Sequence, residues 1–276
     1  LSSKMGYEVM NMNLGAMDNK TGDVESYGLL YQWGRKDPFP AAPTLTGTTT
    51  TVGATIYDGD NNEIKITNSS WSSTDNNNLA YAIAHPTVCL SSMKQFATSR
   101  DWLEADKSND ALWGNPKGGE KDAGNNLLNK GAKSFYDPCP VGWRVPPADV
   151  FRNFTASGGY AWVIDEFDIA DISGDDAKTL ADYDYGWVFN LSDSASSYFP
   201  AAARYDGSYA MLMGSMSGLW GSYWGNAPYP GDMFQGGAYA VLSFQIKDQQ
   251  GGEMITTSPA GGGARADAYS VRCIRE

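Results

Sequence analysis

YGWVFNL at residues 185–191 and YFPAAARY at residues 198–205 begin the part of the sequence that decides the fold class. Each run is short, mostly apolar or aromatic, and bounded by turn residues such as Asp206-Gly207. Such runs are typical of β-strands. Four further runs continue the pattern toward the end of the chain: LWGSYWG at 219–225, AYAVLSFQIK at 238–247, MITT at 254–257 and AYSVRCI at 268–274. The last third is therefore predicted to form small sheets of short strands.

The first third carries fewer strand signals and one clear change of composition. The runs from Tyr7 to Leu14 and from Gly28 to Gly34 are each predicted to form a strand. Residues 44–73 are rich in Thr, Asn, Gly and Ser. Within them, residues 48–56 and 63–67 have strand propensity and flank the turn signal DGDNN. We expect residues 44–73 to form an inserted β-hairpin that protrudes from the domain.

Helical patterns are scarce in this sequence. Short helices are predicted at Asn78–His85, Pro146–Phe154 and Asp175–Leu180. In the second of these, proline is tolerated in the first turn, an acidic residue favours the N-terminal end, and the apolar residues share one face. No repeat of 20 to 50 residues is present and no linker interrupts the middle. We therefore expect a single domain over residues 1–276, with an acidic insertion at residues 160–185.

The composition and charge exclude several classes of protein. Of the 276 residues, 42% are hydrophobic and 13% are aromatic, which is too many for a disordered chain. The net charge of -12 would repel the phosphates of a nucleic acid or an anionic membrane surface. No apolar run approaches the roughly 18 to 20 residues that cross a bilayer, so no membrane span is predicted. Residues 1–5 lack the pattern of a signal peptide, so we expect that signal to be absent or removed, and the chain to be a fragment of a longer protein.

The three cysteines, Cys89, Cys139 and Cys273, are too far apart in the sequence to form a CxxC motif. The single histidine, His85, cannot complete a zinc site with them. One disulfide and one free thiol would fit an oxidising compartment. Three buried, reduced thiols are the alternative that the residues alone leave open.

Several segments resemble the motifs of one known family, and they follow in that family's order. VMNMNLGA at residues 9–16 resembles the family's VMDRNLGA, and GLLYQWGRKDPF at residues 28–39 is similar to its GLYYQWGRKDPF. DPCPVGWRVP at residues 137–146 resembles its DPCPxGWRVP. Three later segments match FPAAGYR, GYYW and SVRC: residues 199–204, 218–224 and 270–273. The family is the Fibrobacter succinogenes major paralogous domain family.

This resemblance implies an α+β domain similar to C-type lectins and to formylglycine-generating enzymes, with short twisted antiparallel sheets, few helices and long loops. It implies an extracellular or outer-surface protein of Bacteroidetes-type bacteria, in a family whose members are often lipoproteins or fimbria-associated. It also implies a disulfide between Cys139 and Cys273, which leaves Cys89 as a buried free thiol. Closing a loop as long as the one between these two cysteines stabilises the fold by about 4 to 5 kcal/mol in the chain-entropy model. The chain departs from the family at Asn11 and Met12, where the family has an Asp-Arg pair, so any ion pair made there is absent.

Candidate catalytic and metal sites are few. His85 stands beside an apolar run and is expected to be structural rather than the base of a hydrolytic triad. DGDNN at residues 58–62 begins like a calcium loop but lacks the later glycine and glutamate, so a hairpin turn is expected. An acidic stretch could supply paired carboxylates for glycoside hydrolysis or oxygen ligands for calcium, although a solvated loop is the simpler interpretation. This stretch comprises Asp165, Glu166, Asp168, Asp171, Asp175, Asp176, Asp182 and Asp184. We predict no cofactor and no metal, with calcium in this stretch as the alternative.

The aromatic segment LWGSYWGNAPYP at residues 219–230 is the candidate binding site. Tryptophan and tyrosine rings can stack on the CH faces of sugars, while Asn and Asp side chains bind hydroxyl groups. The candidate ligand-binding residues are Trp220, Tyr223, Asn226, Tyr229 and Asp232. The alternative is that these rings lie in the core. We expect a core position for Trp224 and leave both interpretations open for Trp220 and Tyr229.

These observations predict a cell-surface binding or adhesion module that is not an enzyme and that recognises a glycan or a partner protein. The first alternative is an accessory or tip subunit of a fimbria, which would present an apolar patch or an open strand edge near residues 44–67. The second is an enzyme of the formylglycine-generating type, which would need Cys139 and Cys273 as thiols.

Overall fold

Turn residues interrupt the apolar runs of this chain every few positions, so its strands are short. The structure, a computed structural model, describes residues 1–45, 52–68, 78–92, 100–103, 109–118, 120, 122–123, 127–152, 184–229, 237–245, 254–257 and 262–276. The helices among them are α1 (Leu79–Ala84) and the 3-10 helices η1 (Val24–Ser26) and η5 (Gly214–Met216). The strands of the first half are β1 (Leu29–Gln32), β2 (Pro38–Pro40), β3 (Ile56–Tyr57), β4 (Glu63–Ile64), β5 (Thr67–Asn68), β6 (Val88–Cys89) and β7 (Trp143–Arg144). Those of the second half are β8 (Gly186–Ser192), β9 (Ala195–Pro200), β10 (Tyr205–Asp206), β11 (Met211–Leu212), β12 (Trp220–Pro228), β13 (Gly237–Gln245), β14 (Met254–Thr257), β15 (Gly262–Ala264), β16 (Ala268–Ser270) and β17 (Ile274–Arg275).

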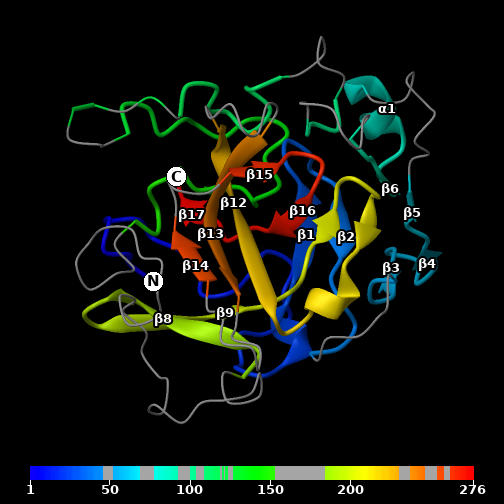
Figure 1. Cartoon of the computed structure of the whole chain (residues 1–276), viewed down its shortest axis with the longest axis horizontal. Coiled ribbons are helices and arrows are strands. Elements are labelled where there is room, and N and C mark those ends of the chain that lie inside the picture. The colour runs from blue at the N-terminus through cyan, green and yellow to red at the C-terminus, as the bar shows by residue number, and fades with distance from the viewer. Residues whose placement is uncertain are drawn as a thin grey trace.

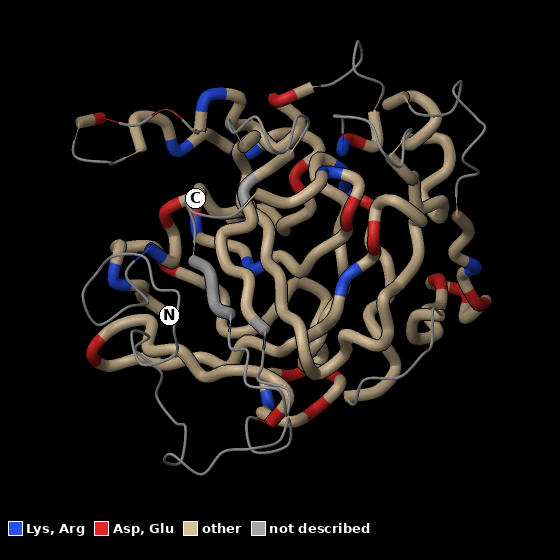
Figure 2. Tube along the Cα trace, in the orientation of Figure 1, with Lys and Arg blue, Asp and Glu red and all other residues tan. Residues whose placement is uncertain are grey.

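A nine-stranded sheet occupies the centre of the molecule (Figure 1). Its main path runs β11-β10-β16-β12-β13-β14, and β1, β2 and β15 pair alongside it. All its pairs are antiparallel except that of β12 with β16. Two-stranded sheets surround it: β17 with β7, β3 with β4, β5 with β6, and β8 with β9. Most charged segments lie in the loops, and the central strands are largely uncharged (Figure 2).

The two faces of the central sheet pack into two different cores, because consecutive residues of β12 point to opposite sides. Tyr223 faces the β8–β9 hairpin, and its ring centroid lies 5.3 Å from that of Phe199. Trp224 faces the other way and stacks on Tyr269 with centroids 4.1 Å apart. Gly263 lies against this stack, where a Cβ atom would come within 2.7 Å of the Tyr269 ring and 2.8 Å of the Trp224 ring. The disulfide cysteines belong to this second core.

The coarse fold prediction, sheets of short and mostly antiparallel strands with few helices, is confirmed. Each strand run predicted in the last third contains at least part of a strand. The described part of the predicted insertion at residues 44–73 contains the hairpin of β3 and β4, joined through residues 58–62. Helix α1 begins where the sequence predicts, because the Asn78 side chain accepts a hydrogen bond from the Tyr81 N–H at 2.8 Å. Of the helices in the described residues, none has the length and apolar character needed to span a membrane.

Two predicted elements are wrong. The segment from Tyr7 to Leu14 is not a strand but makes single bridges, because bends at residues 11 and 12 interrupt its pairing with the last strands. Within the predicted helix at residues 146–154, residues 148–152 form turns closed by bonds from Val150 N to Pro147 O and from Arg152 N to Asp149 O. The Asp149 carboxylate accepts a hydrogen bond from the Tyr7 hydroxyl at 2.8 Å. The helix predicted at residues 175–180, and all of the acidic insertion except residues 184–185, lie outside the described residues.

Candidate functional site

Strand β12 carries most of the predicted binding residues and separates them into two groups. Trp220 is its first residue, and Tyr229 follows its last residue, Pro228. A strand advances about 3.3 Å per residue, so the two rings lie roughly 25 to 30 Å apart along it. One sugar unit cannot contact both rings. The two ends of β12 are therefore separate candidate sites.

The middle of β12 is structural, which corrects the prediction for Tyr223. Its side chain is fully buried, donates a hydrogen bond to Pro200 O at 2.9 Å and accepts one from Asn13 Nδ2 at 3.3 Å. Burial raises the pKa of the Tyr223 hydroxyl to about 12. A surface ligand cannot reach this ring. The expected core position of Trp224 is confirmed, since its side chain is 0% exposed.

Asn226 is also corrected from a ligand residue to a structural one. It is 1% exposed, accepts a hydrogen bond from Asn115 Nδ2 at 2.9 Å and donates one to Lys130 O at 3.2 Å. Both polar ends of its amide are thus used to tie β12 to the loops beside it. Tyr229, just beyond, is half-buried against the small apolar cluster that contains Leu127. Asp232 lies outside the described residues.

The Trp220 end of β12 combines an aromatic ring with a partly exposed cation. The indole is half-buried and donates from Nε1 to Ser243 Oγ at 3.2 Å. The guanidinium carbon of Arg204 lies 5.2 Å from its ring centroid, in the range of a cation–π contact. The Arg204 side chain is 22% exposed. An aromatic ring and a cation therefore lie together where solvent can reach both.

A buried acidic group lies behind Arg204. The Asp267 carboxylate is 3.9 Å from Arg204 Nη1 and accepts hydrogen bonds from the Tyr269 hydroxyl and the Gly207 N–H, each at 2.7 Å. Burial raises the pKa of Asp267, although Arg204 and the Tyr269 hydroxyl favour its ionised form. Sequence reasoning missed Arg204, because nothing in its spacing shows that Ala203 N bonds to Trp220 O and so brings the two chain segments together.

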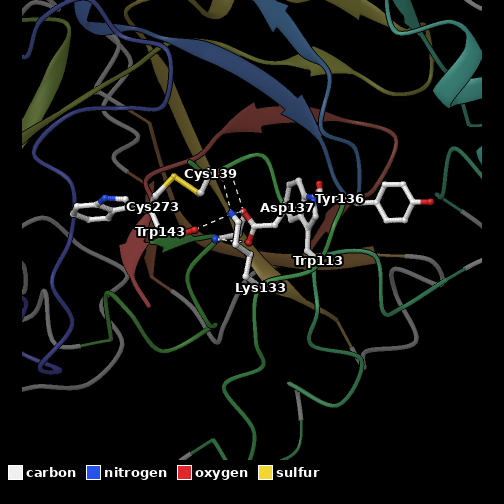
Figure 3. Close-up of a disulfide and its surroundings, with 8 residues drawn as sticks. Trp113, Lys133, Tyr136, Asp137, Cys139, Trp143 and Cys273 are labelled. Carbon is white, nitrogen blue, oxygen red and sulfur yellow. Dashed lines mark hydrogen bonds and ion pairs between the residues drawn. A yellow bond between two sulfur atoms is a disulfide. The ribbon is translucent and has the colours of Figure 1, made fainter. Parts of the chain in front are cut away.

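The structure joins Cys139 to Cys273 in a disulfide, as the resemblance implies, with Cα atoms 6.0 Å apart (Figure 3). Beside it, the buried Asp137 carboxylate accepts hydrogen bonds from Cys139 N at 2.9 Å and Val145 N at 2.8 Å. Lys133 Nζ lies 3.1 Å from the same carboxylate and also donates to the Cys139 and Trp143 carbonyls. Burial raises the pKa of Asp137, although Lys133 and the two backbone N–H groups act to lower it. The region is a closed network of charge and hydrogen bonds.

The third cysteine, Cys89, is free and fully buried, as expected. Burial raises the pKa of its thiol to about 12. Because the thiolate is the reactive form of cysteine, this side chain is inert near neutral pH. His85 lies at the C-terminal end of α1, and its ring packs on Tyr81 with centroids 4.1 Å apart.

The acidic residues of two described turns have local partners. Asp58 accepts hydrogen bonds from the Asp60 and Asn62 backbone N–H groups at 2.9 and 2.8 Å, so residues 58–62 form a hairpin turn. Asp18, Asp23 and Glu25 bring carboxylate oxygens within 4.8 Å of one another. Asp18 pairs with Lys20 at 2.9 Å, and Asp23 caps η1. Of the acidic stretch at residues 165–184, only Asp184 is described.

A cleft of about 350 Å³ lies between the β3–β4 hairpin and the central sheet. The hairpin side contributes residues 52–55 and 63–66 together with Asn68. The sheet side contributes Pro40, Tyr205 and Met211. The sequence predicted the hairpin but not the hollow beneath it, because the hollow depends on how β2 and β10 approach it.

Comparisons with protein-family models, with curated proteins and with solved structures found no match to this chain.

Proposed function

We propose that this protein is a non-enzymatic binding module of the cell surface, and that it binds a glycan at the Trp220 end of β12. The observation that carries this proposal is the pairing of the half-buried Trp220 ring with the partly exposed Arg204 guanidinium, 5.2 Å away. An aromatic face with polar groups beside it is the usual composition of a small-ligand site. Asp267 lies on the buried side of Arg204, and its interaction with the guanidinium keeps the cation beside the ring.

The chemistry of the other candidate groups supports binding rather than catalysis. Cys139 and Cys273 form a disulfide, so the two thiols that formylglycine-generating chemistry would need are not available. The thiol of Cys89 is buried and protonated at neutral pH. A structural disulfide also fits a protein that is displayed outside the cytoplasm.

We further propose that the chain has a C-type-lectin-like fold and belongs to the Fibrobacter succinogenes major paralogous domain family. Six sequence segments in the family's order support this, as does the disulfide between the DPCP motif and the final SVRC motif. A crystal structure tests the fold directly. A chain path that superposes on no C-type lectin would remove this part of the proposal.

A glycan array tests the proposed function, with the purified chain applied first in calcium and then in chelator. We expect reproducible binding that falls at least tenfold in Trp220→Ala. Phe135→Ala is the matched control, because this ring is 80% exposed on a different loop and its removal should leave binding unchanged. The chelator arm shows whether calcium takes part. A blank array in both conditions, or equal loss in the two variants, would overturn glycan binding at this end and favour a fimbrial or other protein partner.

A further inference from the structure

We propose that the cleft beneath the β3–β4 hairpin is a second binding site, and that it takes one unit of an uncharged glycan. Its volume of about 350 Å³ falls at the lower end of the roughly 300 to 1,000 Å³ found for small-molecule sites. This is the space of a small ligand rather than of a folded partner.

The walls of the cleft carry both apolar and polar groups. Pro40, Ile64 and Met211 contribute apolar surface, whereas Glu63 and Asn68 contribute hydrogen-bonding groups. Sugars present the same division, with apolar CH faces and polar hydroxyl edges. A purely aliphatic ligand would leave the polar groups of this cleft without partners, which costs binding free energy.

The charges in the cleft cancel one another. Glu63 and Lys65 form an ion pair at 2.5 Å, with side chains that are 45% and 72% exposed. The pair leaves the cleft without net charge, so no strong field selects an anion or a cation. Both groups remain within reach of solvent and can bind hydroxyl groups. An uncharged ligand is therefore favoured over an acidic sugar.

An exposed aromatic residue pairs with one of the residues that line the cleft. Tyr57 is the cross-strand partner of Glu63 in the β3–β4 hairpin, so the two side chains project from the same face. The Tyr57 side chain is 57% exposed. A large exposed ring beside a carboxylate is suited to stack on a sugar ring whose hydroxyls the carboxylate binds.

The cleft is separate from the Trp220 end of β12. Arg204 and Tyr205 are consecutive residues, but they contact different parts of the molecule: Arg204 precedes β10, and Tyr205 is the first residue of that strand. Arg204 faces Trp220, while Tyr205 lines the cleft and donates its hydroxyl proton to Pro40 O at 3.1 Å. Variants in one site should therefore leave the other intact.

Isothermal titration of the full chain tests this site, with a panel of neutral oligosaccharides that covers hexose, pentose, deoxyhexose and N-acetylhexosamine units. We expect at least one neutral sugar to bind with a Kd in the millimolar range or tighter, and its acidic counterpart to bind more weakly. Tyr57→Ala should weaken binding of the neutral sugar about tenfold, because the stacking contact is lost. Thr55→Trp, which places a bulky ring on a residue that lines the cleft, should abolish binding.

Further measurements distinguish loss of binding at the cleft from loss of binding at the Trp220 end and from unfolding of the chain. Asp60→Asn removes an exposed carboxylate from the same hairpin outside the cleft and should bind as the unchanged chain does. Trp220→Ala should also leave the cleft's sugar affinity unchanged. Far-ultraviolet circular dichroism checks that Tyr57→Ala and Thr55→Trp are folded. The proposal is overturned by a panel without binding, by binding that both cleft variants retain, or by binding that Trp220→Ala abolishes.

Discussion

The disulfide region and the Trp220 end of β12 both place a carboxylate beside a cation, but they treat the charges differently. At the disulfide, Lys133 lies 3.1 Å from Asp137, and each group has further hydrogen-bond partners. At the Trp220 end, Arg204 is 3.9 Å from Asp267, and its Nε finds no acceptor among the described residues. The first arrangement uses all its polar groups to hold the chain together. The second leaves part of the guanidinium exposed beside an aromatic ring, which is what a binding site requires.

The largest expected effect comes from opening the disulfide. Reduction, or Cys273→Ser, releases a link between residues 134 positions apart. In the chain-entropy model such a link stabilises the fold by about 5 kcal/mol. The free energy of unfolding in urea should fall by about that amount. Cys89→Ala is the control, since a chain without the free thiol should lose the same free energy on reduction. A reductant that leaves the unfolding midpoint unchanged would contradict the structural role of this bond.

The next effect comes from removing one charge of the closed network. Asp137→Ala leaves Lys133 in a mostly buried position without its carboxylate, and breaking a buried pair in this way costs about 3 to 5 kcal/mol. We expect the free energy of unfolding to fall by about 4 kcal/mol. Adding Lys133→Met should recover part of the loss, because the second change removes the unpaired charge. Strictly additive losses in this double-mutant cycle would show that the two groups do not interact.

A third prediction compares two tryptophans of β12. Trp224→Ala should lower the free energy of unfolding by about 4 kcal/mol, because it empties a fully buried site beside Tyr269. Trp220→Ala should lower it by only about 1 kcal/mol, because its ring is already partly exposed. Urea unfolding of both variants measures the difference of about 3 kcal/mol. Equal losses would mean that Trp220 is a core residue and that the Trp220 end of β12 is not a surface binding site.

The strands were predictable from sequence, whereas the binding residues on them were less so. Runs of apolar residues between turns located β8, β9, β10, β12, β13, β14 and β16 because that pattern is local, but they missed the short strands β11 and β15. Whether Tyr223 or Asn226 faces solvent depends on what covers β12, and this strand is covered on both faces. Its pairing register with β13 also shifts between Tyr223 and Trp224 and again between Trp224 and Pro228, and the sequence does not show these shifts. Long-range contacts such as Arg204 with Trp220 leave no signal in the spacing. The disulfide was predicted through family resemblance rather than from the residues themselves.

The smallest expected effect is the contribution of Asp267, the buried carboxylate beside Arg204, to the pH dependence of the free energy of unfolding. Burial raises the pKa of Asp267 above its ordinary value of 3.8. As the pH rises past 3.8, the unfolded chain loses this proton before the folded chain does. Asp267 therefore contributes most to stability below pH 3.8, and this contribution is lost as the pH rises through the folded pKa. Relative to Asp267→Asn, the unchanged chain should become less stable as the pH rises above 3.8.

The control for this measurement has the opposite sign. Hydrogen bonds from the Asn62 backbone and side chain lower the pKa of Asp58 in the exposed hairpin turn. Its contribution to stability is present above pH 3.8 and is lost as the pH falls through the lowered pKa. Relative to Asp58→Asn, the unchanged chain should become more stable as the pH rises. Urea unfolding of the three proteins from pH 3 to 7 measures both slopes. Slopes of the same sign would mean that Arg204 and the Tyr269 hydroxyl outweigh burial and keep Asp267 ionised in the folded chain.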